Sequence, residues 1–283
     1  MDLFQYCTPG ASFREEQVAV SDNVSLRVIT FSPAEKTNNP PVVFVPGWIS
    51  LMRGWQVVLR EMTKDFDIVY LETREKITSK VNGKVKFGVS EIGGDIVNII
   101  ARLSLPEKGY VLFGSSLGAT VILDCFRFLN PKPLCLVLIG PNAVFRVSKL
   151  WMAFVHCFYP GFYLLLKPVV KWYLRTFRMD VKADYAQYEK YCNALDAADP
   201  WKLKKAIIPF STYRVWDLLP KIDAPVLIVG ASKDKLHEPE NLKKMISMIP
   251  HATHLDMGTN MGTHSIDMVS ALRRYLSELK QTK

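Results

Sequence analysis

The chain has 283 residues, of which 49% are apolar or aromatic and 22% are charged, so it can bury a large core and does not have the composition of a disordered protein. Lys and Arg outnumber Asp and Glu by 36 to 27, and a net charge of +9 suits an anionic membrane surface or an acidic substrate. These basic residues are scattered and no nucleic-acid-binding motif occurs, so nucleic acid is not an expected partner.

The first predicted elements form a hairpin. Residues 1–6 lack the basic start and the apolar core of a secretory signal, so we expect a cytoplasmic protein. Residues 13–20 and 25–31 alternate in polarity and are rich in β-branched side chains, and Ser21-Asp22-Asn23 supplies a turn between them. This pattern predicts two antiparallel strands.

Short apolar runs then alternate with segments of helical spacing. Runs of this kind are typical of strands that are buried on both faces, and strands alternating with helices indicate a parallel sheet with right-handed crossovers. The predicted strands cover residues 42–45, 68–71, 110–113, 134–139, 226–229 and 253–257, and the predicted helices cover 55–62, 89–103, 119–129, 242–248 and 266–279.

One long segment, from about residue 143 to 213, contains no strand pattern and many aromatic side chains. We predict that it is a helical cap over the ends of the strands, which divides the chain into core residues 1–142, cap residues 143–213 and core residues 214–283. The stretch from Leu150 to Leu166 has no charged residue. It is interrupted by Pro160-Gly161 and is shorter than the roughly 20 residues of a membrane span, so we interpret it as a buried or interfacial helix.

The strongest motif is Gly114-Ser115-Ser116-Leu117-Gly118, which fits G-x-S-x-G. It directly follows a predicted buried strand and leads into a predicted helix. A tight turn in this context exposes the central hydroxyl at the sheet edge, next to a helix N-terminus that favours negative charge. Ser116 is therefore the candidate nucleophile, and Ser115 is its neighbour in the pattern.

With this motif, nearly the whole chain resembles the α/β-hydrolase superfamily, in particular its capped, serine esterase- and lipase-like members. The resemblance implies an α/β fold with an eight-stranded, mostly parallel sheet flanked by helices. It also implies that the second strand is antiparallel, that the helical cap is inserted after the sixth strand, and that the catalytic residues follow in the order Ser, acid, His.

The order gives candidates for the acid and the base. Asp234 ends a segment similar to the P-V-L-x-x-x-G-x-x-D pattern of the family, and Glu238 is a weaker alternative. His264 lies between the last predicted strand and the last predicted helix, where the resemblance implies the general base. The remaining histidines fit this position less well: His156, His237, His251 and His254.

The resemblance also implies an oxyanion hole made of two backbone N–H groups. One belongs to Leu117 and the other to Trp48, in Pro46-Gly47-Trp48, where most relatives have His-Gly. A second departure from the family follows the fourth strand, where residues 71–75 are polar and lack the usual glycine, so the conformation of this loop stays open.

These residues predict a serine hydrolase that cleaves a carboxylic ester or thioester of a fairly apolar acyl substrate through an acyl-enzyme. A C–C bond-cleaving, lyase-like or peroxidase-like enzyme and a catalytically silent binding protein are the alternatives. Ser116 argues against reactions that need a carboxylate nucleophile, and no metal or nucleotide motif indicates a cofactor. The basic, aromatic cap either packs on the sheet and lines a pocket or also makes peripheral contact with an anionic membrane.

Overall fold

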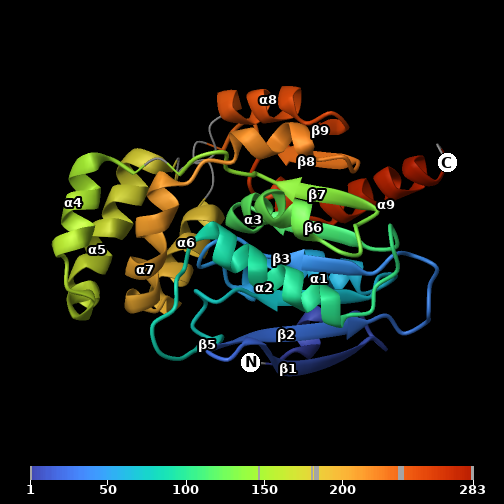
Figure 1. Ribbon diagram of the computed structural model, residues 1–283, viewed down its shortest axis with the longest axis horizontal. Coiled ribbons are helices and arrows are strands. Elements are labelled where there is room, and N and C mark those ends of the chain that lie inside the picture. The colour runs from blue at the N-terminus through green and yellow to red at the C-terminus, as the bar shows by residue number, and fades with distance from the viewer. Residues whose placement is uncertain (1, 146, 180, 182–184, 235–238, 282–283) are drawn as a thin grey trace.

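The computed structural model describes residues 2–145, 147–179, 181, 185–234 and 239–281. Its centre is one mixed sheet, whose main path has the strand order β1-β2-β4-β3-β6-β7-β8-β9 (Figure 1). The strands are β1 (Ser12–Ser21), β2 (Val24–Ser32), β3 (Val42–Val45), β4 (Ile68–Glu72), β5 (Lys80–Val81), β6 (Val111–Ser115), β7 (Cys135–Ile139), β8 (Val226–Gly230) and β9 (Ala252–Asp256).

The predicted α/β sheet is confirmed, and its strand count needs one correction. Strand β2 pairs antiparallel with both β1 and β4, whereas β4, β3, β6, β7, β8 and β9 pair in parallel. The sequence predicts eight strands, and the structure has a ninth, β5, off the main path. This two-residue strand pairs with the start of β2 through Val24 and Ser25. It has too few residues to show a periodicity, so the sequence pattern does not reveal it.

Helices cover both faces of the sheet because its central strands are apolar on both sides. Val43 and Val45 of β3 belong to the core beneath α2 and α3, whereas Val42 and Phe44 belong to the core beneath α1 and α9. The helices that flank the sheet are α1 (Gln56–Met62), α2 (Val89–Arg102), α3 (Leu117–Cys125), α8 (Pro239–Met248) and α9 (Ile266–Gln281).

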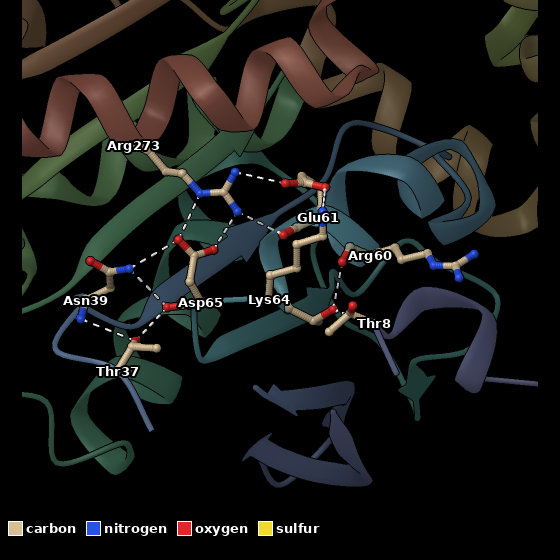
Figure 2. Close-up of polar contacts among 9 residues, drawn as sticks. Thr8, Thr37, Asn39, Arg60, Glu61, Lys64, Asp65 and Arg273 are labelled. Carbon is tan, nitrogen blue, oxygen red and sulfur yellow. Dashed lines mark hydrogen bonds and ion pairs between the residues drawn. The ribbon is translucent and has the colours of Figure 1, made fainter. Parts of the chain in front are cut away.

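Helix α9 is tied to α1 and to the turn that follows it by an arginine. The guanidinium of Arg273 donates hydrogen bonds to both carboxylate oxygens of Asp65, at 2.8 and 2.6 Å, and to Glu61 Oε1 at 2.9 Å (Figure 2). The Asp65 carbonyl in turn accepts from the hydroxyl of Thr37 at 2.6 Å. A bidentate guanidinium–carboxylate pair fixes direction as well as distance. Since α9 begins two residues after His264, this anchor helps to fix the base candidate relative to the sheet.

The α4–α7 segment lies between β7 and β8 in the chain. It consists of α4 (Lys149–Cys157), α5 (Tyr163–Tyr173), α6 (Tyr185–Ala197) and α7 (Pro200–Thr212). These helices lie together beyond one end of the sheet, at the left of Figure 1. An isolated β-bridge between Val144 and Arg214 joins the two ends of the segment. The segment falls within the stretch for which the sequence predicts a cap, and the division into core and cap stays a prediction.

Two adjacent glycines on α2 provide a test of the packing between α2 and α3. A Cβ at Gly93 would lie 2.9 Å from the Cβ of Cys125, whereas a Cβ at the exposed Gly94 would meet no atom within 4 Å. We expect Gly94→Ala to raise the free energy of unfolding by about 0.5–1 kcal/mol, because alanine favours helix. We expect Gly93→Ala to lower it by about 1–3 kcal/mol through overpacking. Urea denaturation measures both, and equal shifts for the two variants would contradict the packing described.

Candidate active site

Ser116 stands in a strained turn between β6 and α3. Its φ is 49° and its ψ is −114°, a backbone conformation that L-residues other than glycine rarely adopt. Two hydrogen bonds hold it: the Ser116 N–H donates to the carbonyl of Ile139 at 2.8 Å, and the Ser116 carbonyl accepts from the N–H of Thr120 at 3.1 Å. The turn brings the hydroxyl to the start of α3, where helix N–H groups favour negative charge.

The end of β3 approaches this turn closely. A Cβ at Gly118 would collide with the backbone carbonyls at the end of β3, and a Cβ at Gly47 would lie 3.2 Å from the Cβ of Ser116. Only glycine allows both backbones to come so near. The peptide N–H groups of Trp48 and Leu117, the two oxyanion candidates, therefore belong to the two segments that meet here.

A buried lysine holds the loop that follows β3. Lys76 Nζ donates hydrogen bonds to the carbonyls of Gly47 at 2.5 Å and Ser50 at 2.7 Å. Between these two residues Ile49 has a φ of 48°, which is strained for a β-branched side chain. Burial lowers the pKa of Lys76 to about 8, and the nearby carboxylates of Glu75 and Glu72 act in the opposite direction.

The glycine-free loop after β4, whose conformation the sequence left open, is held by buried polar contacts. Arg74 makes a bidentate pair with Asp95 of α2, at 2.7 and 2.6 Å. Lys202 of α7 donates to the carbonyls of Lys76 at 2.6 Å and Ser79 at 2.7 Å. The loop therefore connects the segment after β3 to α2 on one side and to the α4–α7 segment on the other.

The hydroxyl of Ser116 has a partner that no sequence motif marks. Asn142 Nδ2 donates to Ser116 Oγ at 3.1 Å. Asn142 follows β7 and is fixed by Thr120, whose hydroxyl donates to the Asn142 carbonyl at 2.9 Å and accepts from the Asn142 N–H at 3.0 Å. Since the amide occupies an acceptor position of Oγ, the hydroxyl proton stays available for a base.

His264 is buried and held on two sides. Its Nδ1 lies 2.9 Å from the carbonyl of Asn260 and 2.9 Å from the hydroxyl of Thr263. Because a carbonyl can only accept, the first contact assigns the neutral ring's proton to Nδ1 and leaves Nε2 with its lone pair. The imidazole also stacks on the buried ring of Trp55, with centroids 3.9 Å apart.

Asp234 is buried and connected to His264 through a shared neighbour. Its Oδ2 accepts from Asn260 Nδ2 at 3.1 Å, and its Oδ1 accepts from Gln187 Nε2 of α6 at 3.2 Å. The side chain of Asn260 thus bonds to the acid candidate, while its carbonyl bonds to the imidazole of the base candidate. The described hydrogen bonds lead from Asp234 to His264 by way of Asn260.

A lysine of α6 lies at the other ring nitrogen of His264. Lys190 Nζ is 3.4 Å from His264 Nε2 and donates to Asn260 Oδ1 at 2.5 Å. Its aliphatic stem packs against Gly54, where a Cβ would lie 3.2 Å from the lysine Cδ. The amine therefore contacts the nitrogen that a general base would use.

The alternatives to the acid and the base fall in different places. Glu238 and His237 lie outside the described residues. His156 on α4 and His251 before β9 are exposed. His254 lies within β9 and reaches the cavity described below.

Most of the predicted site residues line one cavity of about 1350 Å³. Ser116, Asp234, His264 and Trp48 all line it, whereas the side chain of Leu117 is buried beside it. Much of its wall is apolar and comes from the α4–α7 segment, with Trp151, Val155, Leu166, Val170, Tyr173 and Phe210 among its members. The described residues include no group of three or more His, Cys, Asp or Glu side chains placed to hold a metal ion.

Five residues of the site were not predicted from the sequence: Asn142, Trp55, Asn260, Gln187 and Lys190. Asn142 and Asn260 each follow a predicted strand at the end of the sheet that carries the site, and this position was the one signal that marked them. Trp55, Gln187 and Lys190 belong to helical segments with no motif, so only their position in the fold relates them to the site.

Comparisons with known proteins identify the fold. No protein-family model and no curated protein sequence matches the chain. Many solved structures do, including an esterase from Thermogutta terrifontis (17% identity, TM-score 0.73, 95% of this chain and 99% of that one) and a hydrolase from Pseudomonas aeruginosa (17%, 0.75, 94% and 98%). A third is a structure described as a membrane phospholipase A and bacterial virulence factor (17%, 0.68, 96% and 87%). The chain therefore has the α/β-hydrolase fold.

The buried ammonium of Lys76 predicts a pH dependence of stability. Its pKa is about 8 in the folded chain and near the ordinary 10.5 when unfolded, so between these values the unfolded chain binds the additional proton. The contribution of this group to the free energy of unfolding is therefore lowest below pH 8 and rises as the pH increases toward 10.5.

The variant Lys76→Met has no titrating group at this position and serves as the reference. We expect the difference in unfolding free energy between wild type and Lys76→Met to shift in favour of wild type from about pH 7 to about pH 9.5. Denaturant titrations measure this shift, and a constant difference would contradict it.

Proposed function

We propose that the protein is a serine hydrolase that cleaves a carboxylic ester or thioester of a fairly apolar acyl substrate through an acyl-enzyme. The observation that carries this proposal is the strained turn at Ser116, with a φ of 49° at the start of α3. Strain of this kind persists at functional sites because the surrounding structure enforces it. Asp234, His264 and Trp48 line the same cavity, which supports assigning them to one reaction.

In the proposed reaction Ser116 Oγ attacks the substrate carbonyl carbon while its proton passes to Nε2 of His264. The imidazolium then gives this proton to the leaving group, and the acyl-enzyme is hydrolysed by water in the same way. Asp234 stabilises the imidazolium. Its hydrogen bond from Asn260, whose carbonyl accepts from His264 Nδ1, supports an action through this residue.

The oxyanion of the tetrahedral intermediate would be bound by the backbone N–H groups of Trp48 and Leu117. The close packing of Gly47 on Ser116 supports this role, since it brings the loop after β3 to the nucleophile. Lys76 would preserve the geometry of that loop through its two bonds to the carbonyls of Gly47 and Ser50. Asn142 would orient the hydroxyl of Ser116.

The α4–α7 segment, as the cap, would select the substrate. Its apolar side chains form much of the cavity wall, and Trp48 packs edge-on against Phe210 there, with ring centroids 5.7 Å apart. An acyl chain would bury apolar surface against these groups. One structural neighbour is described as an esterase and another as a membrane phospholipase A, which supports an acyl ester as the substrate class.

A fluorophosphonate probe tests the nucleophile. We expect it to label the wild-type protein and the Ser115→Ala variant, and to leave Ser116→Ala unlabelled, because Ser116 occupies the strained turn whereas Ser115 is buried at the end of β6. Hydrolysis of p-nitrophenyl esters should fall by at least about a thousandfold in Ser116→Ala. Circular dichroism serves as the control for folding. Absence of labelling in folded wild type would instead favour a binding protein, and labelling that follows Ser115 would overturn the assignment.

The apolar cavity predicts a preference for longer acyl chains. Each buried CH₂ group contributes up to about 0.8 kcal/mol, so kcat/KM should rise by up to roughly fourfold per CH₂ from acetyl to octanoyl esters. Steady-state kinetics with p-nitrophenyl esters of graded length measures this series. A maximum at the acetyl ester would exclude a fairly apolar acyl substrate, but it would not contradict the assignment of Ser116 as the nucleophile.

A further inference from the structure

Helices α4 and α5 carry large apolar side chains that face solvent. They form the end of the molecule farthest from the C-terminus, with α7 between them and the sheet (Figure 1). We call the following side chains the outer face: Leu150, Phe162, Leu164, Leu165, Val169 and Trp172. Leu150, Leu164 and Leu165 are exposed at 82%, 72% and 76%, and all six are classed among the exposed apolar side chains of the protein. So many large apolar side chains exposed within one short segment mark an interaction site.

Helix α5 is apolar on its inner side as well. Tyr163, Leu166 and Val170 point the other way, where they line the cavity. Surface helices of globular proteins are normally polar on the side away from the core. The polar groups of α5 are instead Lys167 and Lys171, which pair with Asp196 of α6 at 3.2 and 2.7 Å. Both lysines are therefore directed toward α6, and the outer face itself contains no charged side chain.

The composition of this region resembles that of a membrane segment, although its geometry is bent. Within the described residues no single helix has the length and apolarity to cross a membrane. Lys149–Cys157 and Pro160–Phe177 meet these criteria only as a pair, bent by 106°. A bent apolar pair with one face in solvent suits a location in the plane of a lipid interface.

Charge identifies the kind of surface that fits. Between residues 143 and 179 the sequence contains six Lys and Arg and no Asp or Glu. Lys149, at the start of α4, and Arg175, just after α5, are exposed next to the outer face. A second copy of the chain would bring one basic surface against another, which like charges oppose. An anionic lipid surface offers both the apolar layer and the complementary charge.

We propose that the outer face of α4 and α5 docks into the interface of an anionic lipid bilayer, with its apolar side chains among the acyl chains and its basic residues at the headgroups. The inner sides of the same two helices line the cavity, so docking brings the cavity next to the membrane. The docking does not depend on the proposed hydrolysis, since the outer-face side chains are distinct from the site residues.

Vesicle sedimentation tests the proposal. The proteins are wild type, Ser116→Ala, an outer-face variant with Leu165→Ser and Trp172→Ser, and a control with Val57→Ser and Phe128→Ser, which removes two side chains that are exposed at 51% and 59% elsewhere. The vesicles contain phosphatidylcholine alone or with phosphatidylserine. We expect wild type, Ser116→Ala and the control to bind the anionic vesicles, and to bind more weakly at high salt. Binding by the outer-face variant should fall at least about tenfold.

Three results would overturn the proposal: no binding of wild type to either vesicle, equal binding by the outer-face variant, or a wild-type dimer in analytical ultracentrifugation that the outer-face variant abolishes without any lipid binding. Hydrolysis of a soluble short-chain ester by the outer-face variant is measured in parallel. Because Ser116→Ala retains the outer face and the outer-face variant retains Ser116, failure of docking and failure of the proposed hydrolase activity are read separately.

Discussion

The close approach of the end of β3 to the first turn of α3 is the constraint on which the rest of the site depends. Gly118 and Gly47 make it sterically feasible, since a side chain at either position would press on backbone or on the Cβ of Ser116. Beside this contact the chain passes from β6 to α3 in a sharp turn, in which Ser116 takes the strained conformation. The same approach sets the loop carrying Trp48 beside the hydroxyl. Nucleophile and oxyanion candidates are therefore products of one packing contact.

Polar contacts of the loop after β4 stabilise this arrangement. The loop after β4 is buried although it is rich in charge, and burial of unpaired charge is strongly unfavourable. Two of its long side chains have specific partners: Arg74 pairs with Asp95, and Lys76 bonds the loop after β3. The carbonyl of Lys76 is itself bonded by Lys202 of α7. Lys202 and Lys76 thus connect the α4–α7 segment to the proposed oxyanion loop, so that the proposed substrate-selecting segment and the candidate site share one hydrogen-bond network.

The sequence predicted those features that depend on local pattern. Strands buried on both faces show as apolar runs, and the motif around Ser116 is recognisable because a tight strand-to-helix turn requires glycine at fixed positions. Asp234, His264 and Trp48 were assigned from the family resemblance by their order relative to those strands; all three line the cavity, and their roles stay a prediction. The neighbours of these residues carry no motif: Asn142 and Asn260 are marked only by their position after a predicted strand, and Trp55 belongs to a segment of helical spacing. The burial of residues 72–76 also escaped prediction, since a polar run normally indicates an exposed loop. The reverse holds for Leu150 and Leu164, which are apolar yet exposed. The hydropathy of a residue alone therefore does not determine whether the fold buries it.

The position of Lys190 bears on the proposed proton transfer from Ser116 to His264. A neutral imidazole has one lone pair at Nε2, and this nitrogen can accept a single hydrogen bond. An N–H of Lys190 and the O–H of Ser116 are therefore competitors for the same acceptor. The described arrangement satisfies them apart, with the amine at 3.4 Å from Nε2 and the serine oxygen bonded by Asn142. In the proposed reaction, Nε2 of His264 could accept the proton of Ser116 only after the amine on α6 had moved away from it, so movement of α6 would set when the nucleophile can react.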